Sequence, residues 1–327
     1  MKSFRSLRFV RRGFTLIELI TAMAITSMLV LVIMQLTNQG IDLWNTAREE
    51  VRTPSRSRAA MKVMGHDLES FQMKAGDNDY QWMFAKAGDK VQGAPKGLDV
   101  PRSAQVGFFA CAPDRNPSVA SSASLRGNYR EARAHNQDTQ GDVSAIGYRL
   151  MYRDQILDLS ATEGDEKGVY PLFSLYRQVV PPRKSFEQLL GNSNLEGGYA
   201  AFEQDDEKNF LCENIVEMNV CFTIRYANDS ADAEKGRVSY KSVSVPVIAS
   251  NNRHHKLAVF GDRIEIDGQK YENARVTSAT ISLTVLTEEG VGVVEQIRKG
   301  RRRIKSADFF AKYTRSFSRM VALPAPL

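Results

Sequence analysis

The side chains most often used in catalysis and metal binding follow none of the known motifs in this 327-residue chain. The four histidines form no His-Glu-x-x-His pair, and the three cysteines form no Cys-x-x-Cys pair. Neither a Gly-x-x-x-x-Gly-Lys phosphate loop nor a Gly-x-Ser-x-Gly nucleophile elbow occurs. We therefore expect no catalytic residues, no metal and no cofactor, and we interpret the chain as not being an enzyme.

Two weaker chemical signals, acidic runs and a pair of cysteines, have simpler interpretations. The acidic runs 77–79 and 205–207 could offer oxygen ligands to calcium, but their spacing is not that of a calcium loop, which favours solvated turns. Cys212 and Cys221 would lie about 30 Å apart on one continuous strand, far beyond disulfide reach. They could pair only across a turn at residues 217–219, which the strand pattern does not favour.

One ionisable residue stands out by its position. Glu18 lies near the start of an apolar run that continues to about Leu36, and no basic residue follows it until Arg48. A carboxylate at that depth in a membrane costs about 2–3 kcal/mol or more unless it is paired. Because the run supplies no cation, the partner of Glu18 must be a lipid, interfacial water or another subunit. We therefore predict a functional role for Glu18.

The elements that position Glu18 are a basic leader and a long apolar helix. Phe14–Met34 would span about 31 Å as a helix, which matches the hydrocarbon core of a bilayer. Removing the five basic residues of positions 1–13 from the total of 44 leaves 39, against 38 acidic residues. The basic excess is therefore local, and it does not indicate a nucleic-acid surface. It predicts a cytoplasmic N-terminus and an outward-facing remainder.

The segment Arg11-Arg12-Gly13-Phe14-Thr15-Leu16-Ile17-Glu18-Leu19 resembles the processing site of type IV prepilins and pseudopilins. The resemblance covers about residues 8–36, and the alternative is a plain single-pass anchor. It implies that a prepilin peptidase cleaves after Gly13 and methylates Phe14. It also implies that Glu18 is the acidic fifth residue of the mature chain. The Phe14 amine of a neighbouring subunit would then pair with Glu18 and fix the axial stagger of a filament.

The resemblance implies a pilin-like α+β fold: a long N-terminal helix, transmembrane in its first half, packed on an antiparallel β-sheet with large loops. Residues 1–13 are assigned to a cleaved leader and 14–36 to a transmembrane and filament-core helix. Residues 37–75 form the amphipathic soluble half of that helix, and 76–290 form a periplasmic β domain. Residues 291–327 form a basic, Phe-rich helical segment.

Hydrophobic periodicity predicts the individual elements. Met61, Met64, Leu68 and Phe71 recur at helical spacing and predict a face packed on the sheet, with the helix running to about Lys74. Pro54 predicts a kink or break at residues 53–55. Predicted strands are Gln105–Ala110, Ala145–Tyr152, Leu172–Val179, Ile215–Tyr226, Val238–Val245, Lys256–Val259 and Ala274–Leu286.

The remaining segments are assigned from composition and spacing. Residues 112–143 are rich in polar residues and are predicted to be a long excursion between strands. A second long excursion is predicted at residues 184–209. Four aromatic residues near the C-terminus fall at helical spacing and predict one apolar helix face: Phe309, Phe310, Tyr313 and Phe317.

A basic cluster lies close to the C-terminus. Six of the eight residues from 298 to 305 are basic: Arg298, Lys299, Arg301, Arg302, Arg303 and Lys305. One interpretation is a solvated helix face. The other is a contact with an acidic partner subunit or another polyanion. We do not expect nucleic acid to be a partner.

These features together predict a non-catalytic minor pilin or pseudopilin-like subunit of a type II secretion or type IV pilus-like system. We expect it to be single-pass in the inner membrane, with a periplasmic C-terminal domain, and then to join a filament. The expected partners are a prepilin peptidase, other pilin or pseudopilin subunits and an inner-membrane assembly platform. Alternatives are a DNA-uptake or adhesion pilin and, last, a membrane-anchored periplasmic enzyme. The layout also resembles minor pseudopilins and the Verru-Chthon cassette protein C family.

Overall fold

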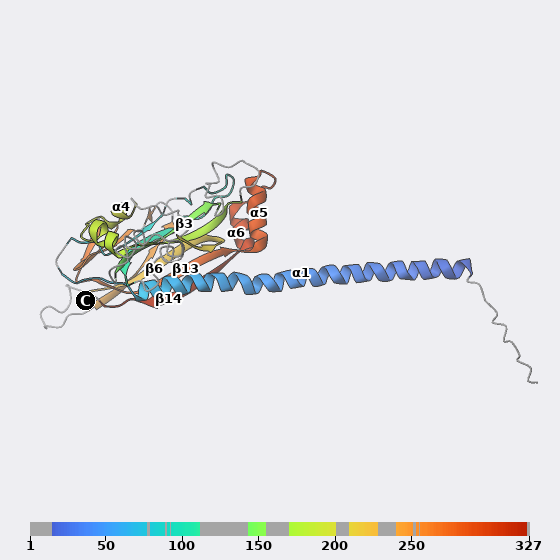
Figure 1. Ribbon diagram of the computed structural model, residues 1–327, viewed down its shortest axis with the longest axis horizontal. Coiled ribbons are helices and arrows are strands. Elements are labelled where there is room, and N and C mark those ends of the chain that lie inside the picture. Colours follow the sequence, from blue (N-terminus) through green and yellow to red (C-terminus); the bar gives the residue numbers. More distant parts are fainter. Residues whose placement is uncertain are drawn as a thin grey trace, which may run out of the picture. The chain divides into compact units, whose positions relative to one another are not determined.

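The computed structural model describes residues 15–76, 79–88, 90–91, 93–111, 143–154, 170–200, 209–227, 240–250, 253–254 and 256–325. The chain divides into two compact units, residues 1–52 and 53–327. Within the described ranges it combines a long N-terminal helix with antiparallel sheets, which confirms the predicted α+β class (Figure 1).

The first element is the helix α1, Leu16–Glu69, and it contains no break. The predicted break at residues 53–55 was wrong, because the backbone is helical through Pro54. A proline removes one N–H donor and crowds the preceding turn. Here Pro54 lies in mid-helix, and the residues that follow are fixed by burial from Ser57 onward, so the helix continues past it.

Helix α1 ends at Glu69, five residues earlier than predicted. The cause is the start of pairing with the sheet. Phe71 forms an isolated antiparallel bridge with Ala110, and the Gln72 N–H donates to the Phe109 carbonyl at 2.8 Å. These hydrogen bonds require extended backbone, so the apolar spacing of Phe71 continues beyond the helix itself.

Two antiparallel sheets form the body of the second unit, where one sheet was predicted. The larger has the order β12-β11-β10-β1-β2-β3-β4-β5. Its strands are β1 Met83–Ala87, β2 Ala104–Ala110, β3 Ser144–Arg153, β4 Leu172–Val180, β5 Phe210–Glu213, β10 Lys256–Val259, β11 Arg263–Ile266 and β12 Gln269–Glu272. The smaller has the order β14-β13-β6-β7, built from β14 Thr314–Ala322, β13 Arg275–Leu286, β6 Ile215–Ala227 and β7 Tyr240–Val247.

All seven predicted strands are present, with ends that agree to within two residues where they are described. The prediction missed β1, β5, β11, β12, β14 and the short pair β8 Ala249–Ser250 and β9 Arg253–His254. It was wrong about Phe317, which pairs with Leu283 in the smaller sheet. Helix α6, Ser306–Tyr313, ends four residues before it, although Phe309 and Tyr313 do share a buried face.

The remaining helices are short. Helix α5, Glu288–Arg298, follows β13 and begins at the cap Thr287, whose hydroxyl accepts from the Gly290 N–H. The predicted excursion 184–209 begins at the last residue of α3 Pro182–Lys184 and, among its described residues, contains η2 Ser185–Leu189 and α4 Leu195–Tyr199. The predicted excursion 112–143 lies outside the described residues except for Val143.

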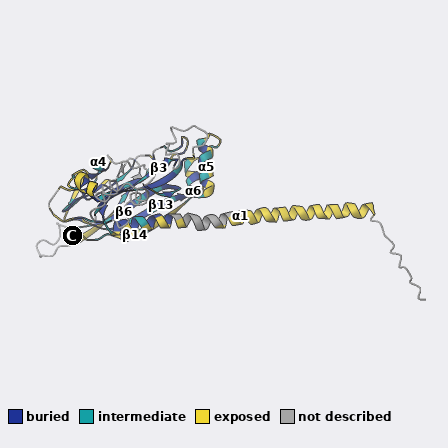
Figure 2. Ribbon diagram, viewed as in Figure 1, coloured by how far each residue is buried: buried dark blue, intermediate teal, exposed yellow. Residues whose placement is uncertain are grey.

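The hydrophobic core gathers side chains from both sheets and from the last turns of α1 (Figure 2). Met61, Met64, Leu68 and Phe71 are buried in it, as predicted. Asp67 is buried on the same helix, with only 1% of its side chain exposed. Its carboxylate receives two hydrogen bonds of 2.7 Å from Arg177 of β4 and a third from the Tyr148 hydroxyl of β3. This network attaches α1 to the larger sheet.

Candidate functional site

The first turn of α1 holds Glu18 in a reciprocal set of hydrogen bonds with Thr15. The Thr15 N–H and hydroxyl donate to Glu18 Oε2 at 2.9 and 3.0 Å. The Glu18 N–H reaches the Thr15 hydroxyl oxygen at 3.4 Å. This is a capping box, in which the residue before the helix and the third residue within it satisfy each other's free N–H groups.

The capping box engages only one of the two carboxylate oxygens of Glu18. Both Thr15 donors reach Oε2, and no donor among the described residues contacts Oε1. Thr15 supplies hydrogen bonds but no positive charge, so the need for a cation, inferred from the sequence, is unchanged. The role of Thr15 was missed, although the pattern Thr-x-x-Glu before an apolar run could have revealed it. Gly13 and Phe14, the predicted processing residues, lie outside the described residues.

The helix that carries Glu18 presents an almost continuous apolar surface. Leu16–Trp44 is long and apolar enough to cross a membrane. Every residue from 15 to 44 is exposed in the isolated chain (Figure 2). The hydroxyls of Thr21, Thr26, Ser27 and Thr37 donate back to carbonyls four residues earlier. These internal hydrogen bonds satisfy polar groups that lipid could not.

The basic cluster is not a helix face. Arg298 is the last residue of α5, and Gly300 reverses the chain with a φ of 68°. Residues 301–305 are not helical, and exposed and half-buried positions alternate along them. Lys299 pairs with Glu295 at 2.5 Å, and Arg302 donates to the Tyr313 hydroxyl at 3.4 Å.

The alternation places Arg301, Arg303 and Lys305 on the exposed side. Within the described ranges they make no ion pair. Glu18 and this cluster belong to different compact units.

Other candidate ligands from the sequence do not converge within the described part of the chain. There, no group of three or more His, Cys, Asp or Glu side chains is close enough to hold a metal ion. Asp79 pairs with Arg263 at 2.7 Å, whereas residues 77–78 and 205–207 lie outside the described residues. Cys212 lies in β5 and Cys221 in β6, and none of the three cysteines forms a disulfide.

The comparisons agree with the geometry of the first helix. A family model described as the prokaryotic N-terminal methylation motif matches residues 8–34. The motif, the long apolar helix and the antiparallel sheets define a type IV pilin-like protein. This chain is therefore similar to type IV pilins and pseudopilins, and the motif implies processing by a prepilin peptidase and, in general, assembly with other pilins. Neither the curated proteins nor the solved structures contained a match. The Verru-Chthon resemblance stays a prediction.

Proposed function

We propose that this protein is a non-catalytic minor pilin or pseudopilin-like subunit that assembles through its N-terminal helix into a periplasmic or surface filament. The observation that carries the proposal is Glu18, presented at the start of a helix whose apolar residues from Leu16 to Trp44 are all exposed. Such a surface is stable only in lipid or against other apolar helices. We propose the inner membrane as its first environment and the filament core as its second.

The proposed mechanism uses the two oxygens of Glu18 differently. Thr15 holds Oε2 and thereby orients the carboxylate. Oε1 then accepts the Phe14 amine of a neighbouring subunit after cleavage. In a low-dielectric helical bundle this pair offsets the cost of burying the carboxylate and selects one axial register. An inner-membrane assembly platform would bring the subunits together.

The first test concerns processing. Mass spectrometry of the membrane-extracted protein should find Phe14 as the N-terminal residue, carrying one methyl group. The host must contain an active prepilin peptidase. An intact Met1 terminus in such a host would contradict the prepilin assignment, whatever the later fate of the subunit.

The second test separates the charge of Glu18 from its capping role. Glu18→Gln keeps an oxygen acceptor for Thr15 but removes the charge, whereas Glu18→Leu removes both. Both variants should insert and be cleaved at Gly13. Both should be depleted about tenfold or more from sheared filaments or crosslinked subunit complexes, because an unpaired buried amine costs several kcal/mol. If Glu18→Gln assembles as wild type does, the pairing mechanism is wrong.

A second candidate function, a DNA-uptake or adhesion pilin, rests on the exposed cations Arg301, Arg303 and Lys305. It predicts that the full-length protein shifts DNA in a gel, and that replacing these three residues with serine abolishes the shift. A matched control replaces three other exposed lysines: Lys74, Lys96 and Lys184. Equal loss in both variants would indicate only non-specific charge attraction.

A further inference from the structure

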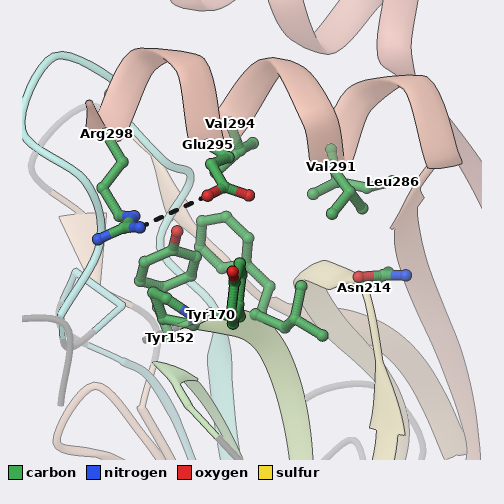
Figure 3. Close-up of a pocket in the computed structure, with 11 residues that line it drawn as sticks. Tyr152, Tyr170, Asn214, Leu286, Val291, Val294, Glu295 and Arg298 are labelled. Atoms are coloured by element: carbon green, nitrogen blue, oxygen red, sulfur yellow. Dashed lines mark ion pairs between the residues drawn. The ribbon is translucent and has the colours of Figure 1, made fainter. Parts of the chain in front are cut away.

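A pocket of about 210 Å³ lies in the second unit, where β3, β4 and the end of β13 meet α5 (Figure 3). Eight of its eleven lining residues are aromatic or aliphatic. The rings of Tyr152 and Phe173 form one wall, and Val291 and Val294 of α5 contribute to the opposite wall. Tyr170, with 61% of its surface exposed, stands at the mouth.

Two lining residues of the pocket have a buried acceptor without a hydrogen bond among the described residues, Asn214 and Glu295, but Glu295 is neutralised by ion pairs and Asn214 is not. Asn214 connects β5 and β6 with a φ of 64°, and only 8% of its surface is exposed. Its N–H donates to the Phe173 carbonyl at 2.6 Å, and its carbonyl accepts from the Leu286 N–H at 2.7 Å. Its side-chain Oδ1 is buried and has no hydrogen-bond partner among the described residues. Figure 3 shows the oxygen end of this amide turned toward the tyrosine side of the pocket.

The charged groups of the pocket already have partners. Arg298 Nη2 lies 3.7 Å from Glu295 Oε1, and both side chains come from α5 (Figure 3). Burial raises the pKa of Tyr152 well above its ordinary value, so its phenol stays neutral. The pocket therefore suits a neutral group better than an ion.

Size and chemistry narrow the ligand further. An apolar cavity of about 150 Å³ holds a benzene molecule, so this pocket has room for one six-membered ring with a small substituent. A buried acceptor without a donor is unfavourable, so that substituent should carry a donor. A pyranose ring fits poorly, because hydroxyls surround it and most of these walls offer no partner.

We propose that this pocket binds the side chain of a tyrosine presented by a partner polypeptide. The phenol donates to Asn214 Oδ1, and the ring packs between Phe173 and the valines of α5. A buried aromatic anchor with a polar rim is the usual form of an energetic hot spot between proteins. The contact is separate from Glu18, so it goes beyond the proposed assembly mechanism.

The test uses two probes that differ by one hydroxyl, N-acetyltyrosinamide and N-acetylphenylalaninamide. They are titrated into the full-length, detergent-solubilised protein, and the methyl NMR signals of Leu286, Val291 and Val294 are followed. The tyrosine probe should shift these signals saturably. It should bind about two- to tenfold more tightly than the phenylalanine probe, which is the effect of one neutral hydrogen bond.

Variants identify the atoms responsible. Asn214→Gly tolerates the positive φ and removes Oδ1, so the two probes should bind equally. Val291→Phe fills the pocket and should abolish both shifts. Gly292→Ala, beside it on α5 with open space around its Cβ position, should bind as wild type does.

The proposal is wrong if the wild type binds neither probe or binds both equally, or if Val291→Phe binds the tyrosine probe normally. Saturable binding of methyl glucopyranoside in place of the tyrosine probe would assign the pocket to sugars and also overturn it. The test does not depend on filament assembly, so its failure leaves the Glu18 experiment intact.

Discussion

Two of the carboxylates of helix α1, Asp67 and Glu18, meet the cost of leaving water in opposite ways. Asp67 is buried and receives hydrogen bonds from Arg177 and Tyr148 of the larger sheet. Glu18 is exposed in the isolated chain and receives hydrogen bonds from Thr15 alone among the described residues. A carboxylate leaves water at acceptable cost only when a cation and donors replace the water. The first acid is completed within its own chain, whereas the second requires another molecule.

The surroundings of the two acids differ in the same way. Near Asp67, the apolar side chains of α1 are covered by the sheets. Between residues 15 and 44 the apolar side chains are exposed. One helix therefore begins as a surface for lipid or partner helices and ends as part of a domain core. The comparison predicts that substitutions around Asp67 affect folding, whereas those around Glu18 affect assembly.

The largest expected effect comes from breaking the pair that the chain completes itself. Arg177→Met leaves Asp67 buried without its cation. We expect the free energy of unfolding to fall by about 3–5 kcal/mol, measured by denaturant unfolding of the solubilised full-length protein. Membrane insertion and cleavage at Gly13 should be unaffected.

The matched control for this prediction is the double variant Asp67→Leu/Arg177→Met. It replaces the ion pair with apolar side chains, so it should recover much of the lost stability. If Arg177→Met alone is as stable as the wild type, the pair is not buried as described. In that case the contrast with Glu18 fails.

A smaller effect is expected from Tyr148→Phe, which removes one hydrogen bond to Asp67 but keeps the ring. The loss should be about 1.5–3 kcal/mol at neutral pH, because the acceptor is charged. Burial, followed by the charge of Asp67, raises the pKa of Tyr148 well above its ordinary value. In the unfolded chain the Tyr148 phenol ionises near pH 10, whereas in the native protein it stays protonated. The free energy of unfolding of the wild type should therefore decline above that pH.

The pH profile of Tyr148→Phe provides a check on this reasoning. Because phenylalanine cannot ionise, the variant should lose less stability than wild type between neutral pH and pH values above about 10. Equal declines would mean that Tyr148 does not contribute to this pH dependence.

Local patterns in the sequence predicted one of the two acids well. Glu18 stands in a contiguous motif in which basic leader, glycine and apolar run occur in register, so its importance is visible without a structure. The partner of Asp67 is 110 residues away in the chain. No local pattern shows that Arg177 and Tyr148 come together, because the pairing of β3 with β4 on the sheet decides it. Asn214 was missed for the same reason.

The strands divide along similar lines. The predicted strands are mostly long apolar or alternating segments, such as Ile215–Tyr226 and Ala274–Leu286. Strands β5, β11 and β12 are four residues long, and periodicity is weak over so few residues, although the equally short β10 was predicted. For β14 the aromatic spacing suited a helix, but the long edge of β13 selected an extended backbone.

A third prediction concerns the capping box between Thr15 and Glu18. Thr15→Val keeps the shape of Thr15 but removes the hydroxyl that caps α1, and this should cost about 1 kcal/mol. Amides in the first turn of the helix should then exchange with deuterium about fivefold faster in detergent micelles, because that turn opens more often. The control is Thr21→Val, whose hydroxyl only donates back to the Ile17 carbonyl. Equal exchange in the two variants would mean that the capping box does not hold this turn.

The smallest effect is expected at a third carboxylate, Glu196 of α4, whose burial is intermediate between that of Glu18 and that of Asp67. Its oxygens are each 2.7 Å from a lysine, Lys86 of β1 and Lys256 of β10. Burial opposes its ionisation, but the two lysines outweigh burial and hold the pKa of Glu196 below its ordinary value. Because the site is partly exposed, Glu196→Gln should cost only up to about 1 kcal/mol at pH 7.

The pH dependence of Glu196→Gln tests whether folding lowers the pKa of Glu196. A carboxyl group whose pKa is lowered by folding stabilises the protein above its unfolded pKa, and that contribution disappears as pH falls through the folded pKa. Urea unfolding at pH 7 should therefore separate Glu196→Gln from wild type, and the difference should shrink as the pH is lowered below about 4. Glu187→Gln, which removes an exposed pair with Arg183, serves as the control and should differ by less than about 0.5 kcal/mol at either pH. A gap for Glu196→Gln that persists or widens in acid would mean that the lysines do not stabilise its charged form. Glu196 would then resemble Glu18 more than Asp67, because its own chain would not supply the cations that stabilise its charge.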